Sequence, residues 1–116
     1  SPGEEAVPHK SLLLGEDLVR HTVVVCEGPF DAFRVGPGAV ATFGVDTTPS
    51  QLLRISRYPT RIIILDSESK AQERARELCD NLSVYPGRTI RIELDAPDPG
   101  SATPREVARL RRSFLE

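Results

Sequence analysis

Two clusters of acidic residues each follow a short apolar run, in an arrangement suited to binding a divalent cation. The run 23–26 ends at Glu27, and the run 62–65 ends at Asp66 and Glu68. Because uninterrupted apolar runs bounded by polar residues are typical of strands buried on both faces, both runs predict strands of a parallel sheet. Ligands of open α/β sheets bind beyond the carboxyl ends of such strands, which is where these acids fall.

Three carboxylates brought together at one sheet edge would repel each other unless a cation neutralised them. The repulsion is roughly 4 kcal/mol per pair at ~4 Å and an effective dielectric near 20. An all-oxygen ligand set, without His or Cys, favours Mg²⁺ or Mn²⁺ over zinc. A single acid after a strand is usually a helix cap or a turn residue. Two clusters at equivalent positions of two strands instead favour a metal site.

The segment that follows the first run contains a further acid, Asp31. Gly28 allows a sharp turn and a close approach to a ligand, because it carries no Cβ. Asp31 falls four residues after Glu27, in the first turn of the helix expected at 29–35. Two roles are open for Asp31: capping the N–H groups of that helix, or contributing to the metal site.

Strands and helices alternate regularly from Thr22 onward, and they must position these acids. Strands are expected at 22–26, 39–43, 61–65 and 89–94, and helices at 29–35, 49–57, around the apolar positions 71–82 and from 104 onward. The third helix has one apolar stripe, which consists of Ala71, Ala75, Leu78, Cys79 and Leu82. Two capping boxes are predicted, at Thr48–Gln51 and Thr103–Glu106.

This order predicts an α/β fold with about four mainly parallel strands flanked by helices. The alternation of polar and apolar residues at 89–94 indicates a half-exposed edge strand. At 116 residues, the chain has the size of one domain, expected at 11–116. Residues 1–10 are rich in Pro, Gly and Glu and predict a disordered lead-in or linker. Residues 11–20 predict a short irregular element against the sheet.

The net charge of −2 is not that of a stand-alone nucleic-acid-binding protein. Lys10 and Lys70 are the only lysines, so nearly all positive charge is arginine, the residue suited to bidentate phosphate contacts. The base composition of the organism explains this bias equally well. Arg57 and Arg88 are candidate nucleic-acid contacts. No apolar run reaches transmembrane length and no leader is recognisable, so we expect a cytoplasmic protein without a membrane partner.

Three motifs resemble the Toprim domain of bacterial and phage-type DNA primases. They are Glu27-Gly28-x-x-Asp31-Ala32, Ala41-Thr42-x-Gly44-x-x-x-Thr48 and Asp66-x-Glu68-x-x-Ala71. The resemblance runs from about Val23 to Asp98. Its tail, 94–99, is similar to the acidic Asp-Pro segment near the end of the primase domain.

The resemblance implies a Toprim, Rossmann-like fold with Glu27, Asp66 and Glu68 as catalytic residues. It also implies Mg²⁺ (or Mn²⁺), bound by these three residues together with Asp31 and Asp98. The chain departs from the family pattern at two positions. Glu68 stands where the family has a second Asp, which changes the geometry available to Mg²⁺. Gly100 stands where the tail motif usually has another Asp.

The expected function is Mg²⁺-dependent nucleotidyl transfer by a DNA primase, a DNA-directed RNA polymerase that makes RNA primers in DNA replication. The expected partners are a DNA template, ribonucleotides, and a replicative helicase or other domains of the same longer chain. We expect the isolated domain to be inactive, because it has neither a zinc module nor a basic DNA-holding region. Two alternatives stay open: a Toprim nuclease or RNA-processing module, and a non-catalytic nucleic-acid-binding module.

Overall fold

The structure, a computed structural model, describes residues 13–42 and 47–116. Its sheet consists of β1 (Thr22–Cys26), β2 (Ala39–Ala41), β3 (Thr60–Ile63) and β4 (Arg88–Arg91), in the order β2-β1-β3-β4. Every neighbouring pair is parallel. The predicted α/β fold with a parallel sheet is therefore confirmed. The predicted lead-in at 1–10 and the motif residue Gly44 lie outside the described residues.

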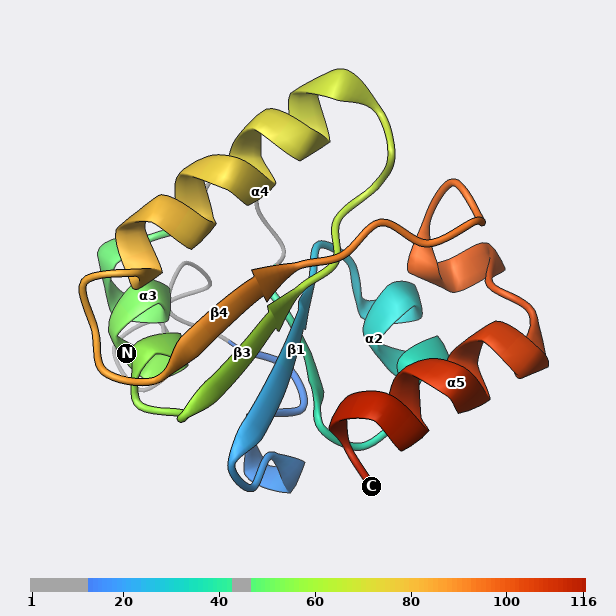
Figure 1. Cartoon of the computed structure of the whole chain (residues 1–116), viewed down its shortest axis with the longest axis horizontal. Coiled ribbons are helices and arrows are strands. Elements are labelled where there is room, and N and C mark those ends of the chain that lie inside the picture. Colours follow the sequence, from blue (N-terminus) through green and yellow to red (C-terminus); the bar gives the residue numbers. More distant parts are fainter. Residues whose placement is uncertain (1–12, 43–46) are drawn as a thin grey trace, which may run out of the picture.

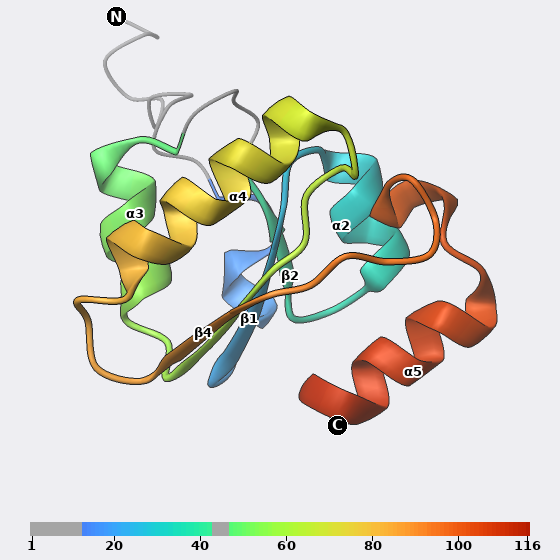
Figure 2. The same cartoon turned by 45° about the horizontal axis from the view of Figure 1, so that its top comes forward.

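Helices cover both faces of this sheet (Figures 1 and 2). The helices α3 (Pro49–Ser56) and α4 (Ser69–Leu82) lie on one face, and α2 (Pro29–Val35) and α5 (Pro104–Phe114) lie on the other. The short 3₁₀ helix η2 (Glu16–Leu18) follows an isolated bridge between Leu14 and Ala41, which matches the irregular element predicted before the first strand. None of the helices in the described part of the chain is long and apolar enough to cross a membrane.

The central strands contribute to a separate apolar core on each face of the sheet. Val23 and Val25 of β1 pack in the cluster that contains the apolar stripe of α4. Val24 and Cys26 alternate with them and pack in the cluster that contains Ala32 of α2 and Leu110 of α5. Successive side chains of a strand point to opposite faces, so burial on both faces requires an uninterrupted apolar run. The sequence-based interpretation of these runs is confirmed.

The strand order places a topological switch between β1 and β3. From β1 the chain crosses to β2 on one side, and it then returns to form β3 and β4 on the other side of β1. Helices that leave β1 and β3 toward opposite faces leave a crevice beyond the carboxyl ends of these two strands. Glu27 follows β1 at this edge and Asp66 follows β3, so the fold brings together the two acidic segments.

Several predicted strand limits differ from the observed ones. We expected strands at 61–65 and 89–94, whereas β3 and β4 end at Ile63 and Arg91. Backbone bonds from Ile64 to Val25 and from Ile92 to Ile63 continue the ladder briefly, before both segments turn away from it. Apolar composition extends beyond the ladder because Ile64 and Leu65 remain buried. The predicted edge position of β4 is correct, whereas the predicted end of the second strand at Phe43 lies outside the described residues.

The two predicted capping boxes have different outcomes. At the start of α3, Gln51 N–H donates to Thr48 Oγ1 at 3.2 Å and Thr48 N–H donates to Gln51 Oε1 at 3.0 Å, as predicted. At the start of α5, Glu106 N–H donates to Thr103 Oγ1, but the Glu106 carboxylate instead accepts from the N–H of Asp95 at 2.6 Å. The second box was therefore half wrong, because a loop N–H distant in sequence competes for the same carboxylate.

A fully buried arginine, Arg61, joins the ends of two helices. Its guanidinium donates six hydrogen bonds, to Thr89 Oγ1 and to the backbone carbonyls of Ser56, Tyr58, Leu82, Tyr85 and Pro86. Several of these carbonyls lie at the carboxyl ends of α3 and α4, where helices leave carbonyls without intrahelical partners. Burial lowers the pKa of Arg61. This arginine is a structural element of the fold at the edge opposite to the acidic residues.

Candidate functional site

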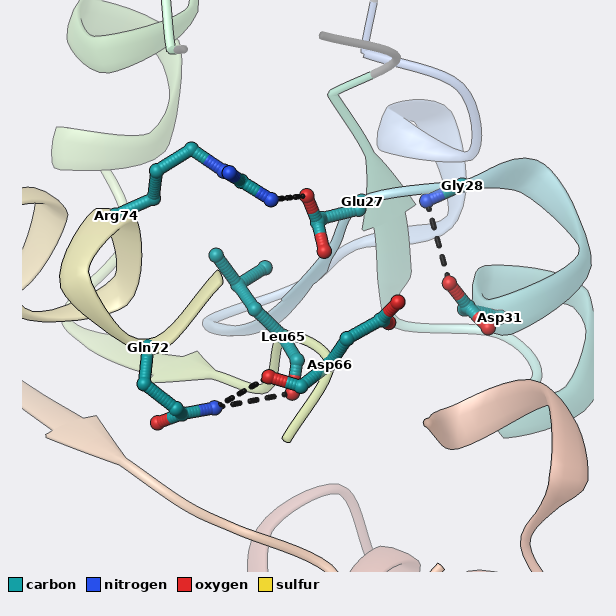
Figure 3. Close-up of polar contacts among 7 residues, drawn as sticks. All are labelled: Glu27, Gly28, Asp31, Leu65, Asp66, Gln72 and Arg74. Carbon is teal, nitrogen blue, oxygen red and sulfur yellow. Dashed lines mark hydrogen bonds and ion pairs between the residues drawn. The ribbon is translucent and has the colours of Figure 1, made fainter. Parts of the chain in front are cut away.

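Glu27 extends from the end of β1 toward α4, where it forms an ion pair with Arg74 (Figure 3). Both side chains are largely buried, with 20% and 21% of their surface exposed. Arg74 lies three residues after Ala71 and four before Leu78, so the apolar face of α4 directs it toward the sheet. The first acid of the predicted site therefore already has a positive partner.

Asp66 follows β3, and its main chain is fixed from two neighbouring elements. Gln72 of α4 is buried, and its Nε2 donates to the carbonyls of Asp66 at 2.7 Å and of Leu65 at 3.3 Å. Gln72 Oε1 in turn accepts from Arg91 of β4 at 2.6 Å. Among the described residues, no group donates a hydrogen bond to the Asp66 carboxyl group, which faces the same space as Glu27 and Asp31 (Figure 3). The backbone of Asp66 is therefore held in place, whereas its carboxyl group has no hydrogen-bond partner within residues 13–42 and 47–116.

Asp31 has the capping role, one of the two that the sequence left open, and it also contacts the tail. One carboxylate oxygen accepts from the N–H of Gly28 at 3.4 Å, which caps the start of α2. The other accepts from the N–H of Gly100 at 2.8 Å, which ties the tail segment to this helix. Burial raises the pKa of Asp31, and the nearby charges of Asp98 and Glu27 raise it further, although its two hydrogen bonds act in the opposite direction.

Asp98 belongs to the tail that approaches this edge. It precedes the 3₁₀ helix η3 (Pro99–Ser101), and its Oδ1 accepts from the N–H of Ser101 at 2.9 Å and from the Ser101 hydroxyl at 3.1 Å. The carbonyl of Pro97 accepts from the N–H of Ser67 at 2.8 Å. These contacts place the tail beside the turn that carries Asp66, although the two segments are about 30 positions apart in sequence.

The other four acidic residues lie close enough to Asp66 for their charges to affect its pKa. Burial raises its pKa to about 6, and the charges of Glu27, Asp31, Asp98 and Glu68, in that order, contribute to the increase. Both causes disfavour the ionised form. We call these five residues the acidic cluster. A carboxyl group whose pKa is raised by neighbouring carboxylates is stabilised in its ionised form by a bound cation.

The acidic cluster is not a ready-made coordination shell. In the described parts of the chain, no group of three or more His, Cys, Asp or Glu side chains is arranged to hold a metal ion. Glu68 is exposed at the N-cap of α4, and Glu27 is turned toward Arg74. The donor set is nevertheless all oxygen and strongly anionic, which fits Mg²⁺ or Mn²⁺ chemically. Cation binding therefore requires some rearrangement of these side chains.

The two candidate nucleic-acid contacts, Arg57 and Arg88, lie at the amino ends of the strands, whereas the acidic cluster lies at their carboxyl ends. Arg57 caps the end of α3 just before β3, and Arg88 begins β4, where it pairs with Thr60 at the start of β3. Both are exposed. Because all strands are parallel, these positions are separated from the acidic cluster by the length of the strands, and Arg57 and Arg88 do not join it.

Three polar residues near the acidic cluster were not predicted from the sequence: Gln72, Arg74 and Arg91. The spacing of Arg74 from the apolar stripe of α4 was an available signal, because a charged residue on the sheet-facing side of a helix needs a partner. Gln72 lies beside Ala71 and Ala75 of the same apolar stripe, so its position likewise indicated a polar side chain that needs a partner. The sequence contained no comparable signal for Arg91, since polar residues are common at alternate positions of a half-exposed edge strand.

A cavity of about 50 Å³ lies beside the ion pair of Glu27 and Arg74. The other residues that line it are the polar Thr42, Thr47, Glu77 and Asn81 and the apolar Val25, Leu52, Leu65 and Leu78. The space is sufficient for water or for the movement of a side chain. The Glu27 carboxylate therefore faces the acidic cluster on one side and a small polar cavity on the other.

Comparison with known proteins shows similarity at the level of structure. Neither a protein-family profile nor a curated protein sequence matches the chain. The crystal structure of the Aquifex aeolicus primase (zinc-binding and RNA polymerase domains) matches with a TM-score of 0.77 at 18% identity, over 95% of this chain and 31% of that chain. The structure of a DnaG primase catalytic domain bound to single-stranded DNA matches with a TM-score of 0.72 at 18% identity, over 94% and 39%.

This chain thus spans less than half the length of each matched primase structure. Low sequence identity limits the comparison to the fold. At that level the agreement is extensive, because almost every residue of the chain is covered. The predicted Toprim fold is confirmed, and the chain has the α/β fold found within the catalytic region of bacterial DnaG primases.

Proposed function

We propose that this chain is the catalytic Toprim part of a DNA primase, which joins ribonucleotides into primers on a DNA template with Mg²⁺ or Mn²⁺. The observation that carries the proposal is the acidic cluster at the topological switch between β1 and β3. The raised pKa of Asp66, together with its carboxyl group that has no partner in the described structure, supports a cation-binding site at this position.

Asp66 and Glu27 would hold the cation, with Glu68 reaching it through its longer side chain. Asp31 and Asp98 would contribute negative charge while they keep the α2 turn and the tail in place through Gly28, Gly100 and Ser101. When bound, the metal would neutralise substrate phosphates and help to orient the attacking 3′-hydroxyl group.

A covalent mechanism through the nearest thiol has no support. Cys26 is fully buried at the end of β1. Burial raises the pKa of its thiol well above the usual range, and the charges of Asp31, Asp66 and Glu27 raise it further. The thiol is therefore protonated and inaccessible, whereas a nucleophilic cysteine must be a thiolate. Direct transfer of a nucleotide to a hydroxyl acceptor requires no such group.

The matched structures support the choice of partners. One of them is a primase catalytic domain bound to single-stranded DNA, so a DNA template is the proposed nucleic-acid partner here. Ribonucleotides are the proposed substrates. Because this chain spans under half of each matched chain, the active protein would be longer. Further domains or a replicative helicase would supply the remaining template contacts, in the cytoplasm.

Primer synthesis by the full-length protein tests the proposal. The wild-type protein should join ribonucleotides into primers on single-stranded DNA with Mg²⁺ or Mn²⁺, and D66N should not. D80N is the matched control, because Asp80 is exposed on α4 away from the acidic cluster. Cleaved fragments in place of primers would favour the nuclease alternative. Nucleic-acid binding without either product would favour the non-catalytic module.

A further inference from the structure

The ion pair between Glu27 and Arg74 places a positive charge at an acid of the proposed cation site. Arg74 Nη2 contacts Glu27 Oε2, and both side chains are about four-fifths buried. Water screens such a pair less than it screens an exposed one. In the metal-free chain the guanidinium therefore neutralises Glu27, whereas Asp66 has no corresponding partner among the described residues.

The contacts of the Arg74 guanidinium are incomplete. Its Nε atom is buried and has no hydrogen-bond partner among the residues that the structure describes. An unsatisfied buried donor is costly, since a guanidinium carries five N–H donors and has lost the water that would solvate them. The side chain therefore stands to gain contacts by moving, and the ion pair is its main restraint.

An alternative position for the guanidinium lies next to the present one. The cavity of about 50 Å³ that Arg74 lines also contains Glu77 on its wall. Glu77 is three residues after Arg74 on α4, a spacing that brings two helical side chains to the same face. Rotation of the long Arg74 side chain toward Glu77 would exchange one carboxylate partner for another without moving α4.

We propose that Arg74 is the resident counter-ion of Glu27 and that a divalent cation must displace it to recruit Glu27. This inference rests on the proposed function, because it assigns Arg74 a role at the proposed cation site. Arg74 is a positioning residue: it holds the Glu27 carboxylate toward α4 when no cation is present. Since guanidinium and cation repel each other across the same carboxylate, the ion pair weakens cation binding. Asp66 has no such competitor in the described part of the chain, so its carboxylate would be available to a cation without displacement of Arg74.

Mn²⁺ binding to the 116-residue chain, followed by electron paramagnetic resonance, tests this role without any activity measurement. Arg74→Gln should bind Mn²⁺ about tenfold more tightly than wild type, the change that ~1.4 kcal/mol of relieved repulsion would produce. Arg74→Lys retains the charge and should stay within about threefold of wild type. Arg76→Gln is the matched control, because Arg76 is exposed on the same helix, and it should leave the affinity unchanged.

A double-mutant cycle identifies Glu27 as the residue through which Arg74 acts. In the Glu27→Gln background, Arg74→Gln should no longer raise the affinity. A purely structural Arg74 would give weaker binding in Arg74→Gln together with a lowered melting temperature, and this result would overturn the inference. The inference would also be overturned if Arg74→Gln bound Mn²⁺ with the wild-type affinity while D66N abolished binding. That pair of results would leave the proposed metal site itself intact. Absence of Mn²⁺ binding in every variant would overturn both the inference and the proposed metal site.

Discussion

The carboxylate of Asp31 accepts a hydrogen bond from the N–H of Gly100, 69 positions later in the chain, at 2.8 Å. This contact joins the start of α2 to the tail. A Cβ atom at Gly100 would lie only 2.8 Å from Asp31 Oδ1 and 3.2 Å from Asp98 Oδ1. The absence of a side chain at residue 100 therefore allows the two acids to approach the tail backbone closely. An aspartate here would add a like charge to a space that is already crowded.

Replacing Gly100 by Ala should displace the Asp31 carboxylate and weaken its bond to the tail. We expect a loss of about 1 kcal/mol of unfolding free energy, the typical net value of one such hydrogen bond. Chemical denaturation measures it. In the Asp31→Ala background the same glycine substitution should cost clearly less, because the crowded atom is gone. An equal cost in both backgrounds would show that the effect does not pass through Asp31.

Asp66→Asn should abolish metal-dependent activity of the full-length protein and leave the fold intact. Asparagine keeps the size of the side chain and removes one charge from a repelling cluster, so above pH 6 the metal-free domain should be more stable by up to about 1 kcal/mol. The melting temperature in EDTA is the measurement, with Asp80→Asn as the control. A decrease of many degrees would mean that the Asp66 side chain supports the fold by hydrogen bonding.

Crystals soaked in millimolar Mn²⁺ locate the cation directly. An anomalous peak is expected beside Asp66, between the ends of β1 and β3, and it should disappear in Asp66→Asn crystals. Occupancy in the isolated domain should be partial, because substrate phosphates normally complete the coordination of such ions. A wild-type crystal without a peak near Glu27, Asp66 or Glu68 would contradict the metal-site proposal.

The stability of the metal-free domain should fall as the pH rises from about 4 to about 6. Asp66 has a pKa near 6 in the folded chain against an ordinary value of 3.8, so within this window the folded state retains a proton that the unfolded state has lost. Stability decreases with pH wherever the folded state binds more protons. Asp31, whose pKa is also raised, acts in the same direction. Above the folded-state pKa the contribution of Asp66 is fully lost.

Thermal melts between pH 4 and pH 7.5 in EDTA measure this effect. The difference between Asp66→Asn and wild type isolates the contribution of Asp66, and it should grow from about zero near pH 4 to its maximum above pH 6. Millimolar Mg²⁺ should reduce the difference at high pH by neutralising the ionised cluster. A difference that does not vary with pH would show that Asp66 has the same pKa in both states.

Periodicity predicted the layers of this fold because burial on both faces of a strand leaves a direct mark on composition. The runs 23–26 and 62–65 each predicted a strand buried on both faces, and the structure pairs these two strands as β1 and β3. The ends of strands were less well predicted, since Ile64 and Leu65 stay buried after the ladder has ended. The predicted capping-box role of the Glu106 carboxylate was wrong for a different reason. This carboxylate accepts from the N–H of Asp95, in another segment, and no local sequence pattern encodes such a contact.

The acidic members of the site were predictable from their positions after strands, whereas its cationic members were not. Arg57 and Arg88 were selected by residue type, and the parallel register places both at the opposite edge of the sheet. Arg74 depends on the rotation of α4 and on the reach of a long side chain across to β1. A contact between a residue within a helix and the end of a strand can be identified only once the three-dimensional arrangement of the two elements is known.

Arg61 should prove to be important for stability and unimportant for chemistry. Arg61→Lys keeps the charge, but an ammonium group has three donors and cannot replace six hydrogen bonds to acceptors spread over two helix ends. We expect a loss of about 2 kcal/mol or more in denaturant unfolding, because buried carbonyls lose their partners. Arg57→Lys, at an exposed position nearby, should change stability by less than about 0.5 kcal/mol. Similar small effects of both substitutions would contradict the structural role.

The isolated domain should bind nucleic acid weakly, and its binding should require a divalent cation. Its net charge is −2, and its acidic cluster lies where the substrate phosphates must come, so without metal the local field repels the backbone. Arg57 and Arg88 lie at the far edge of the sheet and cannot offset this repulsion within the site. Fluorescence anisotropy with a labelled single strand at low salt, in Mg²⁺ and in EDTA, measures the difference. Tight binding in EDTA that Arg57→Gln or Arg88→Gln weakens would show that the strand is held by a basic surface, and it would favour the non-catalytic binding module over the primase proposal.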